Sequence, residues 1–438
     1  MAFIHPQSCE CVKSELDLFN TPPTQTSIES GVWTHYHPIS SLETDGPIEF
    51  NVPGSGDDYL DLAQTQLLIS AKIVKPDGTA LDANQAVGPV NLFIHSLFSQ
   101  VDVALNDKLI SQSSNTYPYR AYLETLMNYG TSALTSQLTT SLWYKDTSGQ
   151  MDSTALEGDD VNKGFVKRAK FSAASATIDL VGKIHSDIFF QQRYLMNGVN
   201  LRVRLVRSSH EFALLTGLDT AFKVVITNAA LRIRKVKLSP NIQLAHAKAL
   251  QLNSAKYPLH RVEVKVFSVP AGNLSTCQEN LFLGQLPKRI IIGCVDNDAL
   301  NGSYKKNPFN FKNFSLNYIA LHVDGHQDVI KPLQPNFTTG NYIQCFADLF
   351  MGIGKLYKDE GVEINREDFK EGYCLYAFDL SPDMSDGGHF NLIKSGNMRL
   401  EMKFGVALPN TVNVVVYAEF ENMLEINKDK NVIVDFAL

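Results

Sequence analysis

The two halves of the chain repeat one order of short alternating segments. Residues 48–52 and residues 262–266 each alternate apolar with polar side chains, which is the pattern of half-buried β-strands. Four further pairs follow in the same order: 98–105 with 314–321, a helix-like stretch ending at Gly130 with 345–350, 201–205 with 400–404, and 222–226 with 412–416. This shared order indicates a duplicated domain built from β-strands.

Length and composition agree with a duplicated β-sandwich. The 438 residues fit two domains of roughly 200 residues each. The chain contains 25 Phe and 16 Tyr, and aromatic side chains favour pleated, half-buried surfaces. We therefore predict an all-β protein made of two tandem jelly-roll β-sandwiches, with short helices in the connections.

Changes in composition set the expected domain boundaries. The first residues are polar and show little periodicity, whereas the stretch after Pro240 is rich in Ala, Leu and Gln and is helix-like. A Ser/Thr-rich stretch in the first half is typical of a long surface loop, which we expect to project outward. The predicted organisation is an extended N-terminal arm at 1–40, a first jelly roll at 41–240 with a surface loop at 131–165, a helical linker at 241–256, and a second jelly roll at 257–438.

Four stretches of the sequence carry a specific pattern of residues. They are SELDLFNTPPTQTSIE at 14–29, GPIEFNVPGSGDDYLDL at 46–62, NTYPYRAYLETLMNYG at 115–130, and ENLFLG at 279–284 with the following Pro287-Lys-Arg. These stretches resemble the major capsid proteins of Polinton/Maverick (adintovirus-type) elements, and the resemblance covers nearly the whole chain.

The resemblance implies a double jelly-roll subunit of the hexon-like lineage. Three such subunits would form a pseudo-hexagonal capsomer, and many capsomers would tile an icosahedral shell around a double-stranded DNA genome. The implied partners are further copies of the chain, a penton-type minor capsid protein and, at most indirectly, the packaged DNA. The implied location is the virion, assembled inside the host cell in either the nucleus or the cytoplasm.

Charge and hydropathy limit the other partners. The formal net charge is −7, and proteins that bind nucleic acid over their whole surface are usually basic, so we expect any contact with DNA to be local. The first residues lack a basic stretch followed by an apolar one, and no run of about 18 apolar residues occurs. We therefore expect no secretory signal and no membrane span, and we expect the six cysteines to be reduced.

Candidate metal and cofactor motifs are incomplete. His322 and His326 have the four-residue spacing of zinc-protease ligands, but they flank an Asp-Gly turn and no Glu follows the first His. Asp296-Asn-Asp298 begins like a calcium loop but lacks the Glu at position twelve. Three further groups are weaker still: His35 with His37 and Cys9 with Cys11 in the arm, and Gly352-Ile-Gly354-Lys355, which lacks the spacing of a phosphate loop. We predict no metal site and no cofactor.

Candidate catalytic motifs are equally weak. Paired carboxylates could serve glycoside hydrolysis, but each acidic pair lies in a turn or polar loop: Asp57-Asp58, Asp159-Asp160 and Asp359-Glu360. Gly54-Ser55-Gly56 is not the five-residue nucleophile elbow and is typical of a turn between strands. We predict no catalytic residue and a protein that is not an enzyme. The alternative is a cellular carbohydrate-binding or glycoside-cleaving β-sandwich, which would need an exposed aromatic platform or facing carboxylates; the chain has two Trp, Trp33 and Trp143.

One set of basic residues stands out on two predicted strands. It could be a solvated face, a subunit interface, or a patch that faces packaged nucleic acid, since phosphate binding needs clustered cations. The set comprises Arg202, Arg204, Arg232, Arg234, Lys235 and Lys237.

Overall fold

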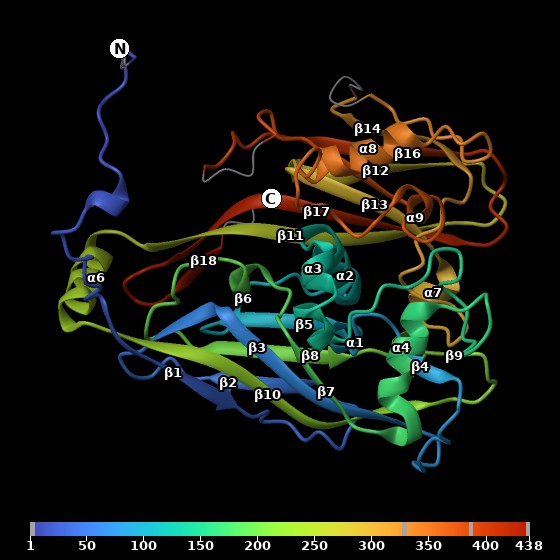
Figure 1. Cartoon of the computed structure of the whole chain (residues 1–438), viewed down its shortest axis with the longest axis horizontal. Helices are drawn as coiled ribbons and strands as arrows, with labels where there is room; N and C mark the ends of the chain where they lie inside the picture. The colour runs from blue at the N-terminus through green and yellow to red at the C-terminus, as the bar shows by residue number, and fades with distance from the viewer. Residues whose placement is uncertain (1–4, 326–330, 385–388, 435–438) are drawn as a thin grey trace.

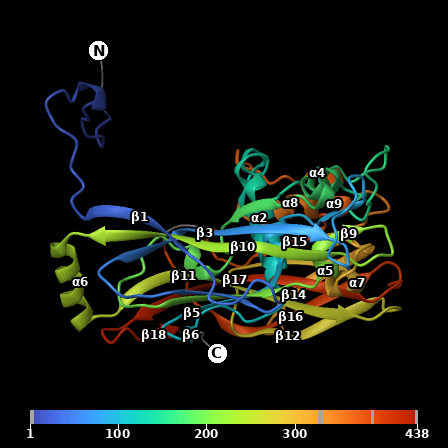
Figure 2. The same ribbon diagram turned by 90° about the horizontal axis from the view of Figure 1, so that it is seen from below.

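The strands form two β-sandwiches that lie against each other, the first below and the second above in Figure 1. The computed structural model describes residues 5–325, 331–384 and 389–434. The strands run along the long axis of the molecule in both sandwiches (Figures 1 and 2). A helix, α6 (Pro240–Leu252), connects the two at one end.

The first sandwich pairs two four-stranded antiparallel sheets. One sheet has the order β1 (Ile28–Tyr36), β10 (Lys223–Leu238), β3 (Tyr59–Val74), β7 (Ile178–Gly182). The other has the order β2 (Ile48–Val52), β8 (Leu201–Arg207), β5 (Phe98–Leu105), β6 (Lys108–Leu109). A small extra sheet joins β4 (Val87–Pro89) to β9 (Leu214–Thr216).

The second sandwich repeats this arrangement. Its first sheet has the order β11 (Ala255–Val269), β17 (Val412–Ile426), β13 (Arg289–Asp296), β15 (Leu375–Asp379), with β18 (Val432–Val434) beside β17. Its second sheet has the order β12 (Ser275–Gln285), β16 (Ser395–Phe404), β14 (Leu316–Val323). The predicted fold, two tandem jelly rolls with short helices, is confirmed.

The sheet orders show which strands correspond in the two jelly rolls. Counted from the sheet edge, β1, β10, β3 and β7 correspond to β11, β17, β13 and β15, while β2, β8 and β5 correspond to β12, β16 and β14. Three of the four predicted strand pairs follow this correspondence. The predicted helix pair agrees with the order of elements, because α2 (Tyr117–Asn128) follows β5 and β6 as α8 (Ile343–Gly352) follows β14. The pairing of 48–52 with 262–266 is wrong, because β11 corresponds to β1 and β2 corresponds to β12.

Short helices occupy the connections. They are α1 (Phe93–Ser96), α2 (Tyr117–Asn128), α3 (Thr131–Leu134), α4 (Lys163–Ser172), α5 (His210–Ala213), α7 (Asn297–Asn301), α8 (Ile343–Gly352) and α9 (Arg366–Lys370), with 3-10 turns η1 (Ser14–Leu16), η2 (Gln137–Ser141), η3 (Ala173–Ser175) and η4 (Asp187–Phe189). In the described part of the chain, no helix has the length and apolar character needed to cross a membrane.

The N-terminal arm is shorter than predicted. Residues 28–36 were assigned to the arm, yet they form β1 and pair with β10 along the edge of the first jelly roll. The strand was missed because its residues are mostly exposed and do not alternate in polarity. The described part of the arm, residues 5–27, is exposed throughout and extends away from the two jelly rolls (Figures 1 and 2).

The 131–165 segment, predicted as a projecting surface loop, is exposed in part and packed in part. It holds α3, η2 and the start of α4, and several of its side chains are buried between the two jelly rolls. Trp143 is 1% exposed and belongs to the same hydrophobic core as strands of the second jelly roll. Thr135, Ser136 and Thr140 are exposed, and their hydroxyls bond to nearby backbone carbonyls within the segment.

Candidate functional surfaces

The junction between the jelly rolls contains a buried charged cluster centred on α2. Arg120 Nε donates to Glu124 Oε1 at 2.9 Å, and Arg120 Nη2 donates to Asp187 Oδ1 on η4 at 2.6 Å. His185 Nδ1 lies 2.5 Å from Glu124 Oε2. The helix exposes little of its surface because it lies between its own jelly roll and β11 and β17 of the other.

The electrostatics of the cluster follow from its burial. Burial alone would raise the pKa of Glu124, but the positive charge of Arg120 and the hydrogen bond with His185 hold it below its ordinary value. Burial raises the pKa of Asp187, and Arg120 opposes that rise. The cavity beside Arg120 and His185 has a volume of about 20 Å³, room for about one water molecule. Arg120 and His185 are too enclosed to receive a sugar or a nucleotide, although Asp187 also lines a wider groove with Val262 and Phe282. We interpret the hydrogen-bonded cluster as a structural junction.

Side chains of the first jelly roll bond to the outer edge of β11 in the second. The backbone N–H of Val262 donates to Asp187 Oδ1 at 3.2 Å, and that of Val264 donates to Gln112 Oε1 at 3.0 Å. The hydroxyl of Thr116 donates to the carbonyl of Val264 at 3.4 Å. An open sheet edge is a template for pairing with another chain, and here the first jelly roll covers it.

A second buried network fixes the 131–165 segment across the junction. Arg168 Nη2 donates to Asp146 Oδ1 at 2.6 Å, and both side chains are fully buried. Asn307 Nδ2, from the second jelly roll, donates to Asp146 Oδ2 at 2.9 Å. Tyr122 stacks on Phe309 with ring centroids 4.2 Å apart. Sequence reasoning missed Arg168, Asp146 and Asn307, because buried polar residues that pair only in the folded chain carry no periodic pattern.

The candidate metal ligands named in the sequence are distributed over several parts of the described structure. His322 is buried with its Nε2 3.3 Å from Glu401, while His326 lies outside the described residues. Asp296 accepts a hydrogen bond from Lys312 at 2.6 Å. His35, His37, Cys9 and Cys11 are exposed. Within the described ranges, the structure brings together no group of three or more His, Cys, Asp or Glu suited to a metal ion.

The remaining candidates are dispersed. The acidic pairs Asp57-Asp58, Asp159-Asp160 and Asp359-Glu360 are exposed, except that Asp58 is half-buried. The basic set divides between two sheets, with two members on β8 and four on β10. Several members bond within the fold: Arg202 and Arg204 with Glu49, Arg234 with Asp61, Lys237 with Glu29, and Arg232 against the Trp33 ring. The basic set therefore does not form one patch. Its members lie on two different sheets, and several of them pair with groups of the same chain.

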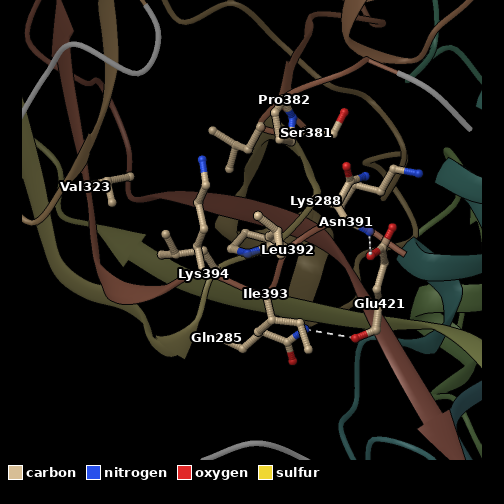
Figure 3. Close-up of a pocket in the computed structure, with 13 residues that line it drawn as sticks. Gln285, Lys288, Val323, Ser381, Pro382, Asn391, Leu392, Ile393, Lys394 and Glu421 are labelled. Carbon is tan, nitrogen blue, oxygen red and sulfur yellow. Dashed lines mark hydrogen bonds between the residues drawn. The ribbon is translucent and has the colours of Figure 1, made fainter. Parts of the chain in front are cut away.

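A small pocket lies beneath the connection between β15 and β16. Asn391 N–H donates to Glu421 Oε2 at 2.7 Å, and Gln285 Nε2 donates to the Glu421 carbonyl at 2.9 Å (Figure 3). The pocket encloses about 100 Å³. Leu392 and Ile393 come from the same connection and are 87% and 66% exposed. The hydrogen bond to Glu421 positions Asn391, while the neighbouring side chains of Leu392 and Ile393 remain in solvent.

Two other regions expose apolar side chains. The arm exposes Leu16, Leu18 and Phe19. Helix α8 is strongly apolar, yet Ile343 and Met351 are exposed and Phe346 and Phe350 are only half-buried. Contiguous exposed apolar surface marks sites of protein–protein contact, so these regions are candidate assembly surfaces.

Comparison with known proteins supports the fold. No protein-family profile matches the chain. An uncharacterized protein of Caenorhabditis elegans is 24% identical over 428 residues, which cover 94% of this chain and 99% of that protein.

Solved viral structures share the architecture of the whole chain. A chain of the Sputnik virophage superposes with a TM-score of 0.64 at 11% identity, covering 100% of this chain and 94% of that one. A chain of the PBCV-1 virus capsid gives 0.59 at 10% identity, covering 96% and 100%. The mavirus major capsid protein gives 0.51 at 13% identity, covering 99% and 97%. The chain is thus a double jelly roll of the kind found in viral capsid structures.

Proposed function

We propose that this chain is a major capsid protein of a double-stranded DNA virus or virus-like element. Three copies form a pseudo-hexagonal capsomer, and capsomers tile an icosahedral shell. The observation that carries the proposal is the full-length match of both jelly rolls, in one chain, to a chain of the Sputnik virophage and to the mavirus major capsid protein. The resemblance of four sequence stretches to Polinton/Maverick capsid proteins supports that lineage.

The surface of the molecule supports self-assembly. Obligate interfaces commonly bury about 2,000–5,000 Å² and are rich in apolar side chains. The arm, α8 and the β15–β16 connection each expose such side chains. We propose that these surfaces contact other copies and a penton-type minor capsid protein in the virion.

The charge distribution fits a shell subunit that touches its genome little. The net charge is −7, and many of the basic side chains on β8 and β10 pair within the fold.

The carbohydrate alternative gains no support from the aromatic residues. Trp143 is buried in the junction, and the Trp33 ring is covered by Arg232 at 4.4 Å. We propose a structural role without catalysis.

Light scattering after size-exclusion chromatography tests the proposal. One chain has a mass of 48.7 kDa, so we expect a stable species at three times that mass, or larger particles visible by electron microscopy. A monomer at every concentration would contradict the proposal. Binding of the monomer to a glycan array would favour the carbohydrate alternative.

A further inference from the structure

We infer that the groove beside α6 binds the N-terminal arm of a second copy of this chain. The part of the arm that enters the groove is residues 15–19, which combine acidic and apolar side chains. This inference rests on the proposed function, because a shell holds many copies of the chain close together. It goes beyond the pseudo-hexagonal capsomer by naming the place on the folded body that receives the arm.

The groove lies between α6 and residues of both jelly rolls. Its volume is about 560 Å³, which is within the range of about 300–1,000 Å³ that is usual for ligand pockets. Ile242 and Leu250 of α6 line one wall. Tyr59, Met196 and Tyr257 line the opposite walls. The groove can therefore receive large apolar side chains.

Helix α6 is poorly covered in the single chain. None of its 13 residues is buried, although helices in proteins are stabilised mainly by packing of an apolar face. The Tyr59 hydroxyl lies 3.0 Å from His246 Nδ1 and joins the helix to the first jelly roll. Ile242 and Leu250 are only half-buried where they line the groove. An apolar occupant would complete the packing of this helix face.

The groove and the arm have complementary charges. The described lining of the groove contains no Asp or Glu, and its basic side chains are Arg193, His246 and Lys256. Residues 15–19 of the arm read Glu-Leu-Asp-Leu-Phe, so two acidic side chains alternate with apolar ones. Complementary charges guide association and fix the register of two surfaces. An apolar segment with acidic neighbours therefore suits an apolar groove with basic residues around it.

The base of the arm is fixed in a direction that leads away from its own groove. Ser27 lines the groove, and its carbonyl accepts a hydrogen bond from the Ser239 N–H at 2.9 Å. The Gln25 side chain accepts from the Ile28 N–H at 2.8 Å and donates to the Ile28 carbonyl at 3.1 Å. Figure 2 shows the arm leaving the body beside β1 and extending away from α6.

The stretch between this base and residues 15–19 is stiff and can reach a neighbour. The eight residues from Phe19 to Ser27 span about 26 Å when they are extended. Pro22 and Pro23 have a fixed φ and keep the residues before them extended. A return to the chain's own groove needs a reversal within this stretch, whereas the groove of a neighbouring copy needs none. The occupant is therefore the arm of a second copy.

A labelled arm peptide tests the groove directly. The protein is the full-length chain with Leu18→Asp and Phe19→Asp, which disables its own arm at two exposed positions and leaves the groove free. The probe is a fluorescein-labelled peptide of residues 12–22, and fluorescence anisotropy measures its binding. We expect saturable binding that weakens as the salt concentration rises, because salt screens the exposed charges.

Charge reversal in the groove locates the binding site. In the same full-length background, Arg193→Glu with Lys256→Glu should weaken binding of the peptide at least tenfold. A peptide with Glu15→Lys and Asp17→Lys should bind this reversed groove more tightly than the unaltered peptide does, because the charges are again complementary.

A matched control carries the same change of charge at a distant place. Lys163→Glu with Lys167→Glu alters two exposed positions of α4, which lies toward the other end of the molecule from α6 (Figure 1). This variant should bind the unaltered peptide as the parent protein does. Far-ultraviolet circular dichroism checks that every variant is folded.

Photocrosslinking distinguishes the arm of a second copy from the chain's own arm. Phe19→p-benzoylphenylalanine, in a chain that is otherwise unaltered, should join the arm to the groove of another chain on irradiation. The denatured product should have twice the single-chain mass of 48.7 kDa. Mass spectrometry should place the link on α6 or on the opposite walls of the groove.

Three results would overturn the inference. If the peptide does not bind, or binds the reversed groove and the matched control equally well, the arm does not enter this groove. If the crosslink stays within one chain, the groove binds the chain's own arm. If the unaltered protein is monomeric at every concentration, the proposed function fails and the inference fails with it. Trimers without peptide binding would contradict the inference alone, so light scattering distinguishes the two failures.

Discussion

Asp187 and Val262 belong to different jelly rolls, yet Asp187 Oδ1 accepts a hydrogen bond from the Val262 backbone N–H at 3.2 Å. The same oxygen accepts from Arg120 at 2.6 Å. A single carboxylate thus joins α2, η4 and the edge of β11. Because these groups are buried, the junction is sensitive to the loss of any one of them.

Replacing Arg120 with Met should destabilise the protein strongly. The variant leaves the carboxylates of Glu124 and Asp187 buried without their cation, which typically costs about 3–5 kcal/mol. Urea unfolding followed by tryptophan fluorescence measures the change, since Trp143 lies in the same junction. Arg202→Ala removes a cation from a solvent-exposed pair with Glu49 and should leave the unfolding midpoint almost unchanged. Equal effects of the two substitutions would contradict the structural role of the cluster.

Glu124 should give the stability a specific dependence on pH. Its pKa in the folded protein lies below the ordinary value of 4.5, so its ionisation stabilises the fold above that value and the contribution is lost as pH falls through the folded pKa. The free energy of unfolding should therefore fall more between about pH 5 and pH 3 in the unaltered protein than in Glu124→Gln. Burial raises the pKa of Asp187, and the Glu124 charge adds to that rise, so Asp187 contributes with the opposite sign and contributes less in Glu124→Gln. Parallel pH profiles would contradict the prediction.

The duplicated fold could be predicted because buried strands carry a periodic pattern. The segments of β5, β8 and β10 alternate or run apolar, and their counterparts in the second half do the same. β1 could not be found in this way, since an edge strand with exposed faces has no apolar period to detect. Because β1 was missed, β2 was paired with β11 instead of β12, and the predicted arm was extended over residues that form β1.

The junction could not be predicted because its residues come together only in the folded chain. Asp146 pairs with Arg168 on the following helix, α4, and with Asn307 from the other jelly roll. The polar composition of 131–165 is typical of both a solvated loop and a hydrogen-bonded buried one. Trp143 and Met151 are buried, which shows that part of the segment is packed. Their burial depends on contacts with the second jelly roll, which the sequence of the segment does not show.

Limited proteolysis should separate the arm from the 131–165 segment. We expect the first cuts in residues 5–27, which are exposed throughout, and slower cutting in 131–165, whose side chains are fixed by Asp146 and Trp143. Mass spectrometry of the early fragments measures the order. Trp143→Ala should cost about 3–5 kcal/mol and make the segment cleavable. A first cut within 131–165 of the unaltered protein would contradict the packed junction.

Deletion of residues 1–26 should weaken assembly and leave the fold intact. These residues, as far as they are described, contact little of the body, whereas Leu16, Leu18 and Phe19 offer apolar side chains to a neighbouring copy. The melting temperature should therefore stay unchanged while the yield of particles or higher assemblies falls.

Deletion of residues 1–36 is the contrasting variant, because it also removes β1 and exposes the edge of β10. That longer deletion should lower the melting temperature as well. Unchanged particle yield in the shorter deletion would show that the arm does not tie copies together, while a lowered melting temperature there would show that the arm belongs to the folded body.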